Sequence, residues 1–85
     1  MAVKILYFAW LRERLDRGEE EVSPPPEVAT IRDLIAWLRA NDEAAELAMQ
    51  RPEIIKAAID AKIVTHDASI IGAKTIALFP PMTGG

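Results

Sequence analysis

The residues best suited to chemistry are the last six, Pro80-Pro81-Met82-Thr83-Gly84-Gly85. They place a carboxylate directly after two glycines, which have no Cβ and can pass through a channel too narrow for a side chain. The two prolines before them hold the preceding segment extended and semi-rigid. Such a segment is suited to insertion into another protein, where its end would be chemically modified.

The terminal carboxylate of Gly85 is a poor acyl donor by itself, because its charge and resonance repel nucleophiles. Joining it to AMP gives a mixed anhydride with a good leaving group. A sulfide or persulfide can attack this anhydride and leave a thiocarboxylate, whose sulfur is nucleophilic and transferable. The chain has no cysteine, so if the protein handles sulfur, the sulfur cannot be carried on a side-chain thiol. Gly85 is therefore the candidate reactive residue.

Two other groups of residues could suggest a site of their own. His66, the only histidine, precedes Asp67, but no serine or cysteine nucleophile is visibly paired with it. Adjacent side chains on an extended segment also point apart, which favours a loop histidine without a catalytic role. The acids of 19–21 alternate between strand faces, which favours a solvated strand over a metal site. We expect no metal site and no permanently bound cofactor.

Length and charge limit the function classes. Eighty-five residues with 51% hydrophobic content predict one compact domain. The net charge of −3, with acids and bases mixed, argues against nucleic-acid binding. No apolar run approaches the roughly 18 residues needed to span a bilayer, and the first residues lack the order of a secretory signal. We expect a cytoplasmic protein without membrane contact.

Periodicity predicts a strand, a short helix and a second strand in the first quarter of the chain. Residues 3–8 alternate, so that Val3, Ile5 and Tyr7 share one face. Residues 9–17 predict a helix that ends at Gly18, and 19–23 a poorer strand. The three prolines of 24–26 form a stiff connector.

The clearest helix covers 30–40, with Thr30 as its cap, Asp33 in the capping-box position and Asn41 ending it in a left-handed turn. Its stripe at i, i+3, i+4 and i+7 marks a buried face. Residues 42–52 are ambiguous, although 44–50 favours a helix. The remaining segments are expected to be strands at 54–60, 63–65 and 74–79, a turn at 61–62 and a loop from 66 to 72.

This order predicts an α+β fold with one long helix packed on a mixed sheet. We expect a domain over residues 1–79 and an extended, flexible Gly-Gly tail over residues 80–85.

The two ends of the chain carry a resemblance to a known family. The segment Phe79-Pro80-Pro81-Met82-Thr83-Gly84-Gly85 resembles the terminus of the molybdopterin synthase small subunits, and residues 4–13 are similar to that family's first strand and turn. The resemblance implies a ubiquitin-like β-grasp fold in which the first and last strands are sheet neighbours.

The resemblance also implies a mechanism. In that family an activating enzyme uses ATP to adenylate the terminal glycine, and a sulfur donor protein supplies sulfur. The tail then enters the large subunit, which converts precursor Z (cyclic pyranopterin monophosphate) to the dithiolene of molybdopterin. The chain would thus be a sulfur-donor subunit, not catalytic alone, within a heterotetrameric sulfurtransferase for molybdenum cofactor biosynthesis.

Four residues match family positions that contact the large subunit: Phe8, Arg12, Ile63 and Phe79. Alternation independently places Phe8 and Phe79 on the sheet face opposite the core, where exposed apolar side chains mark an interface. The chain departs from the family at Ile71-Gly72-Ala73-Lys74, where an acidic run is usual. That departure puts the exact partner in question.

Three alternatives stay open. The chain could carry sulfur for thiamin synthesis or tRNA thiolation, or it could be a ubiquitin-like modifier joined to lysines. From a different class, it could be an interaction module whose end is never activated. The Phe-Pro-Pro segment before the terminal residues favours the molybdopterin pathway.

Overall fold

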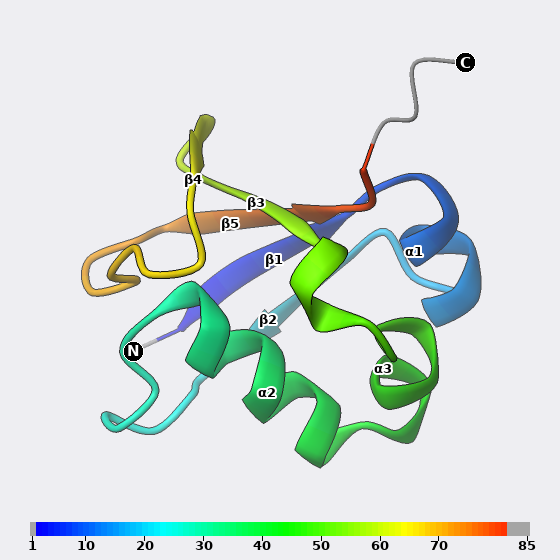
Figure 1. Cartoon of the computed structure of the whole chain (residues 1–85). Coiled ribbons are helices and arrows are strands. Elements are labelled where there is room, and N and C mark those ends of the chain that lie inside the picture. Colours follow the sequence, from blue (N-terminus) through cyan, green and yellow to red (C-terminus); the bar gives the residue numbers. More distant parts are fainter. Residues whose placement is uncertain (1, 82–85) are drawn as a thin grey trace.

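A computed structural model describes residues 2–81, and within this range five strands form one mixed sheet ordered β2-β1-β5-β3-β4 (Figure 1). The predicted tail residues 82–85 lie outside the described residues. The elements are β1 (Val3–Tyr7), α1 (Ala9–Leu15), β2 (Glu19–Val22), α2 (Ile31–Asn41), α3 (Glu43–Ala48), the 3₁₀ helix η1 (Pro52–Ile54), β3 (Lys56–Ile59), β4 (Lys62–Val64) and β5 (Thr75–Phe79).

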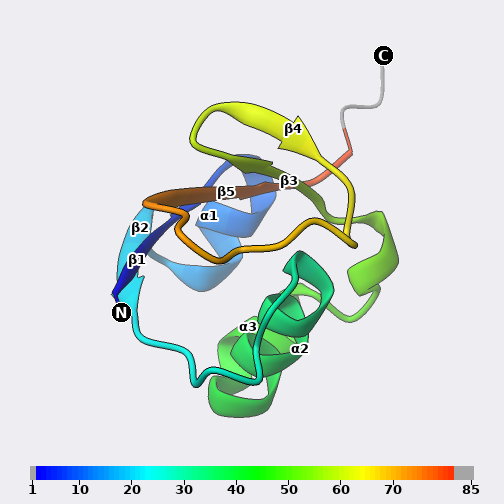
Figure 2. The ribbon, with the colours of Figure 1, turned by 90° about the vertical axis from the view of Figure 1, so that its left-hand side faces the viewer.

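The first and last strands are neighbours, as the resemblance implied. β1 pairs in parallel with β5 and antiparallel with β2, while β3 pairs antiparallel with both β5 and β4. In Figure 2 the sheet lies above the helices, so that α2 and α3 cover one of its faces. Among the described residues no helix covers the other face, which we call the open face.

The core lies between the sheet and the helices. The predicted face of β1 is buried, and Ile76 and Leu78 of β5 join it with none of their surface exposed. The predicted stripe of α2 packs against them, since Ile31, Leu34 and Ile35 are at most 1% exposed. Each such side chain contributes about 1.5–3 kcal/mol through burial, so the alternation of the strands and the stripe of α2 together define the fold.

The start of α2 follows the predicted capping pattern, whereas its end does not. The Asp33 N–H donates to Thr30 Oγ1 at 3.1 Å, and Asp33 Oδ2 accepts from the Ala29 N–H at 3.2 Å. The predicted left-handed turn at Asn41 is wrong, because Asn41 is helical and Asp42 follows in an extended conformation. Asp42 then caps α3, accepting from the Ala44 N–H at 2.9 Å.

Several other boundaries differ from the prediction, most of them by one residue. α1 ends at Leu15, not at 17, because Asp16 already takes a left-handed φ of 56°. The strand expected from residue 54 begins at Lys56, because η1 occupies the preceding residues. The turn expected at 61–62 lies one residue earlier, at Asp60 and Ala61, whose φ angles of 47° and 75° suit a tight two-residue hairpin.

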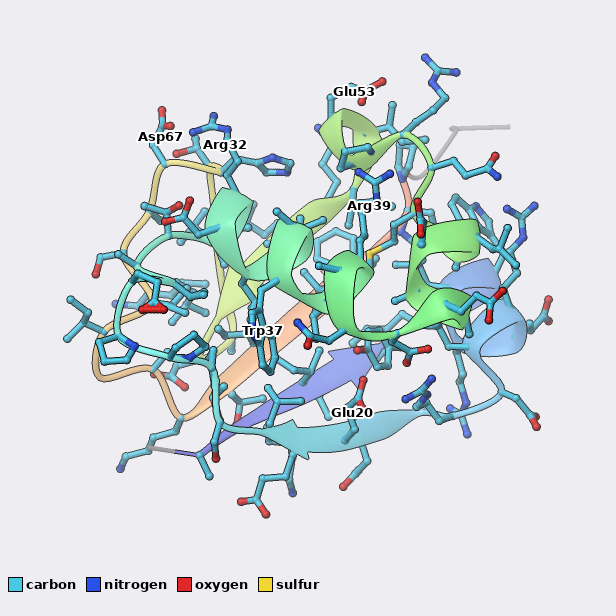
Figure 3. All side chains as sticks on the ribbon, turned by 90° about the horizontal axis from the view of Figure 1, so that it is seen from below. Glu20, Arg32, Trp37, Arg39, Glu53 and Asp67 are labelled. Carbon is cyan, nitrogen blue, oxygen red and sulfur yellow. The ribbon has the colours of Figure 1, made fainter. Side chains whose placement is uncertain are left out.

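A polar network joins β1, β2 and the cap of α3, and it corrects the prediction that the acids of 19–21 are simply solvated. The Tyr7 hydroxyl donates to Glu20, and Arg17 binds Glu20 Oε1 at 3.0 Å and Asp42 Oδ2 at 2.6 Å. Burial and the nearby carboxylate of Glu20 raise the pKa of Tyr7, so its hydroxyl keeps the proton that it donates. Figure 3 shows Glu20 on β2 directed toward the helices.

Asp42 is expected to make stability depend on acid pH. Partial burial would raise its pKa, but hydrogen bonds from Arg17 and the Ala44 N–H outweigh burial and hold the pKa below its usual value. A carboxyl with a lowered folded-state pKa stabilises the fold above its unfolded value of about 3.9, and this stabilisation is lost as the pH falls through the folded-state pKa.

Asp42→Asn, which retains a capping side chain, should therefore cost about 1 kcal/mol at pH 7, since the pair with Arg17 is only partly buried. That cost corresponds to a melting temperature lower by about 4–8 °C, and the difference should shrink as the pH falls below about 4. Thermal unfolding across pH measures both effects. Glu19→Gln, which removes an exposed pair with Lys4, is the control and should change little. A pH-independent difference at Asp42 would contradict this account.

Candidate functional site

The root of the tail is fixed at one end of the sheet. Phe79, the last residue of β5, pairs with Lys56 of β3, and the Phe8 N–H donates to the Leu78 carbonyl oxygen at 3.2 Å. Pro80, the first predicted tail residue, is buried, and Pro81 is half-buried. The chain therefore leaves the sheet from a packed position beside the junction of β1 and α1. The roles predicted for Met82, Thr83, Gly84 and Gly85 lie outside the described residues and stay predictions.

The open face has an apolar row across its strands. Leu6 pairs with Ala77, Ala77 with Ala58, and Ala58 with Ile63, so the row crosses β1, β5, β3 and β4 in order. Directly paired residues point to the same face of a sheet. The open face of these four strands therefore consists of Lys4, Leu6, Phe8, Lys56, Ala58, Ile63, Thr75, Ala77 and Phe79.

The structure places three of the four predicted interface residues on this face. Phe8 is 47% exposed, Ile63 is 78% exposed and Phe79 is half-buried. The prediction that Phe8 and Phe79 lie outside the core is confirmed by the register, and the two residues lie at the same end of the sheet. Ile63 lies farther away, on the edge strand β4. Their contact with a partner stays a prediction.

Arg12, the fourth predicted interface residue, lies on α1 and not on the sheet face. Its guanidinium lies against Gly18, so closely that a Cβ at Gly18 would come within 3.2 Å of Arg12 Cζ. The Gly18 carbonyl oxygen accepts from the Tyr7 N–H at 2.9 Å, which places Gly18 beside the end of β1. Arg12 is exposed, so its guanidinium lies over the backbone of Gly18 without being confined there.

A hollow in the open face was not predicted. Ala58 and Ala77 form its floor, and its volume is about 410 Å³. The remaining lining residues are Leu6, Phe8, Asp60, Ala61 and Thr75. The sequence held part of the signal, since alternation assigns Ala77 to the face of Phe79. What it could not reveal is that Ala58, from a strand distant in sequence, pairs with Ala77 and leaves the depression.

His66 has structural contacts that account for its position. Its Nε2 lies 2.6 Å from the carbonyl oxygen of Ile55, which can only accept, so Nε2 carries the hydrogen. Asp67 pairs with Arg32 at 2.7 Å, as their facing side chains in Figure 3 illustrate, and so does not orient the histidine. Within residues 2–81 no cluster of three potential metal ligands occurs.

The segment that departs from the family pattern lies away from the tail. Lys74 precedes β5, and its carbonyl oxygen accepts from the Lys4 N–H at the start of β1. Gly72 has a φ of 82°, a left-handed conformation that disfavours other residues. Ile71 is 78% exposed on this turn.

Over the described part of the chain, no helix has the length and apolar character to cross a membrane.

Comparison with known proteins gives one family and several relatives. The sequence pattern of the ThiS family matches residues 5–85. The molybdopterin synthase sulfur carrier subunit of Escherichia coli is 29% identical over 83 residues, covering 98% of this chain and 99% of that protein.

Two solved structures share the fold. A Pyrococcus furiosus protein described as molybdopterin converting factor subunit 1 has a TM-score of 0.63 and 25% identity, with 96% of this chain and 99% of that chain covered. SAMP1 from Haloferax volcanii has a TM-score of 0.74 and 20% identity, with both chains covered completely. These likenesses confirm the predicted α+β, ubiquitin-like β-grasp fold.

The two faces of the sheet are expected to respond differently to truncation. Phe8→Ala should cost about 1 kcal/mol or less, because Phe8 is half-exposed. Leu78→Ala should cost about 2–5 kcal/mol, because Leu78 is fully buried between the sheet and the helices. Chemical denaturation of the two variants measures the difference. Equal losses would place Phe8 in the core and remove the basis for an interface there.

Proposed function

The chain belongs to the ThiS family, and on that premise we propose that it is the sulfur-carrier subunit of a molybdopterin synthase. The observation that carries the proposal is the relationship to the E. coli sulfur carrier subunit over 98% of this chain. The ThiS family match extends to Gly85 and so includes the terminal glycines. The packed root of the tail beside an apolar open face supports it, because a carrier needs both a docking surface and an extended reactive end.

The proposed loading takes place at Gly85. Its carboxylate attacks the α-phosphate of an ATP held by the activating enzyme, and pyrophosphate leaves. Sulfide-level sulfur from a donor protein then displaces AMP from the acyl adenylate and leaves a thiocarboxylate. The carrier supplies the acyl group alone, and the catalytic groups and the ATP site belong to the activating enzyme. ATP-dependent loading also accords with a cytoplasmic location.

The proposed delivery uses the open face. Phe8, Phe79 and Ile63 dock on the large subunit and Arg12 contacts it from α1, while the tail enters that subunit's active site. Because Pro80 is buried against the domain, docking of the face fixes where the tail begins. The thiocarboxylate sulfur is then transferred to the pterin precursor, and two carriers with two large subunits make up the heterotetramer.

An experiment can distinguish a sulfur carrier from a protein modifier and from a chain that is never activated. The likeness to SAMP1 concerns the fold alone at 20% identity, so it favours no modifier function. Intact-mass analysis of protein isolated from its host distinguishes the cases. An oxygen-to-sulfur exchange at the terminus supports a carrier, a lysine conjugate supports a modifier, and an unmodified chain under active cofactor synthesis opposes both.

Deletion of Gly85 tests the mechanism most directly. It withdraws the reacting carbon by roughly 3.3–3.6 Å, whereas misplacement by about 1 Å can already cost about 100-fold in rate. We expect the melting temperature to be unchanged. After incubation of the shortened chain with the activating enzyme, ATP and a sulfur source, mass spectrometry should detect no sulfur loading. Met82→Leu keeps the length and both glycines and should load normally. Loading of the shortened chain at its new terminus would refute the proposed chemistry.

Phe79→Ala tests the docking surface. An aromatic side chain at the centre of an interface contributes about 2 kcal/mol or more, so affinity for the large subunit should fall by about 30-fold. Leu47→Ala is the matched control, since Leu47 is 61% exposed but lies on α3, on the helical side. Calorimetry with the purified large subunit measures both. An equal loss for Leu47→Ala would place the interface on the helices instead.

A further inference from the structure

The open face carries both a protruding side chain and a hollow in one row across the strands. We propose that the free chain forms a weak twofold homodimer through this face, with Ile63 of each copy seated in the hollow of the other. The inference goes beyond the proposed function, because it concerns the carrier when no partner is bound.

The protruding side chain is Ile63. It lies on β4, at the edge of the sheet, and is 78% exposed. Ile63 and Phe8 are two of the four large hydrophobic side chains that are exposed within residues 2–81, and both lie on the open face. Apolar side chains grouped in this way on one face mark an association surface.

The hollow can receive such a side chain because its floor is made of small residues. Ala58 and Ala77 pair with each other at the centre of the row, between Leu6 on one side and Ile63 on the other. A volume of about 410 Å³ exceeds what a branched aliphatic side chain occupies. Asp60 also lines the hollow, but the two alanines of the floor are uncharged, so an apolar side chain fits against the floor.

The strand order makes this face complementary to itself. β1 and β4 lie on opposite sides of the β5–β3 pair at equal strand spacing. A twofold axis parallel to the strands and above that pair therefore superposes β4 of one copy on β1 of the other. Ile63 of one copy then faces the Leu6 side of the other's hollow, and the reciprocal contact forms at the same time, as a twofold interface requires.

Three charged side chains of the open face approach this axis, and they do not all favour the arrangement. Lys56, which pairs with Phe79 on β5, comes toward Lys56 of the other copy and opposes it. Lys4 and Asp60 favour it. Lys4 pairs with Thr75, whose carbonyl oxygen accepts from the Asp60 N–H, so these residues share the next row along the strands. The same axis brings Lys4 of one copy toward Asp60 of the other. Asp60 is already held by hydrogen bonds from the Lys74 and Thr75 N–H groups. The glutamates of β2 fall beyond the superposed strands, which limits repulsion between two copies that each carry a net charge of −3.

The proposed dimer is weak and competes with docking. A four-strand face of short strands falls in the size class of transient contacts, below about 1,200 Å². It covers Phe8 and Ile63, which are the residues proposed to bind the large subunit. Dimer and synthase complex therefore exclude one another, and the dimer withdraws the apolar face of the free carrier from water.

The test compares two isoleucines of equal exposure. Sedimentation of the full chain from about 1 μM to about 1 mM spans the range of weak complexes, and the wild-type mass should rise from monomer toward dimer. Ile63→Asp should stay monomeric. Ile71→Asp alters a residue that is also 78% exposed, but on the turn before β5, and it should dimerise as the wild type does. Circular dichroism confirms that both variants are folded.

A second measurement locates the contact. In a mixture of isotope-labelled and unlabelled chains, filtered NOEs should join the Ile63 methyl groups of one copy to Leu6 and Ala77 of the other. A monomer at every concentration, loss of the dimer in Ile71→Asp alone, or intermolecular NOEs confined to other surfaces would overturn the proposal. Sulfur loading at Gly85, assayed separately, decides the proposed function and does not depend on this outcome.

Discussion

The parallel pairing of β1 with β5 is the contact on which the rest of the structure depends. It joins the first residues of the chain to the last strand at the centre of the sheet. Because the two strands run the same way, β1 passes into α1 at the end where β5 releases the tail. The Phe8 N–H to Leu78 bond closes this junction. A fixed root for the tail, with an aromatic side chain beside it, follows from this one pairing.

The alternation of side chains on β1 and β5 separates stability from recognition. Ile5, Ile76 and Leu78 are buried against the helices, whereas Leu6, Ala77 and Phe79 of the same strands lie on the open face. A change on one face therefore leaves the other largely intact, and docking can vary without loss of the core. Arg12 is the exception, because it lies on α1 and not on the sheet, with its guanidinium against Gly18.

The sequence was sufficient to predict an element where its local pattern of apolar residues agrees with the burial of those residues in the fold. The strands at both ends, the stripe of α2 and the cap at Thr30 follow from periodicity and from one side-chain hydrogen bond. The sequence was insufficient where the conformation of a residue depends on a contact with a residue distant in the chain. Asn41 stays helical because the next residue, Asp42, caps α3 and pairs with Arg17. Glu20 turns inward because Tyr7 and Arg17 meet it there. The hollow likewise requires the pairing of Ala58 with Ala77, which no local pattern shows.

An apolar open face is both a means of docking and a liability in water. A carrier proposed to meet an activating enzyme and a large subunit in turn benefits from a face whose central row is apolar, because charges chosen for one partner would oppose another. The lysines of this face, Lys4 and Lys56, lie in the rows on either side of it. The same apolar character invites unwanted association. Two alanines at the centre of the row limit the apolar surface that is exposed, and they also create the hollow. The two alanines thus reduce unwanted association and also give the open face a shape that a partner or a second copy can recognise.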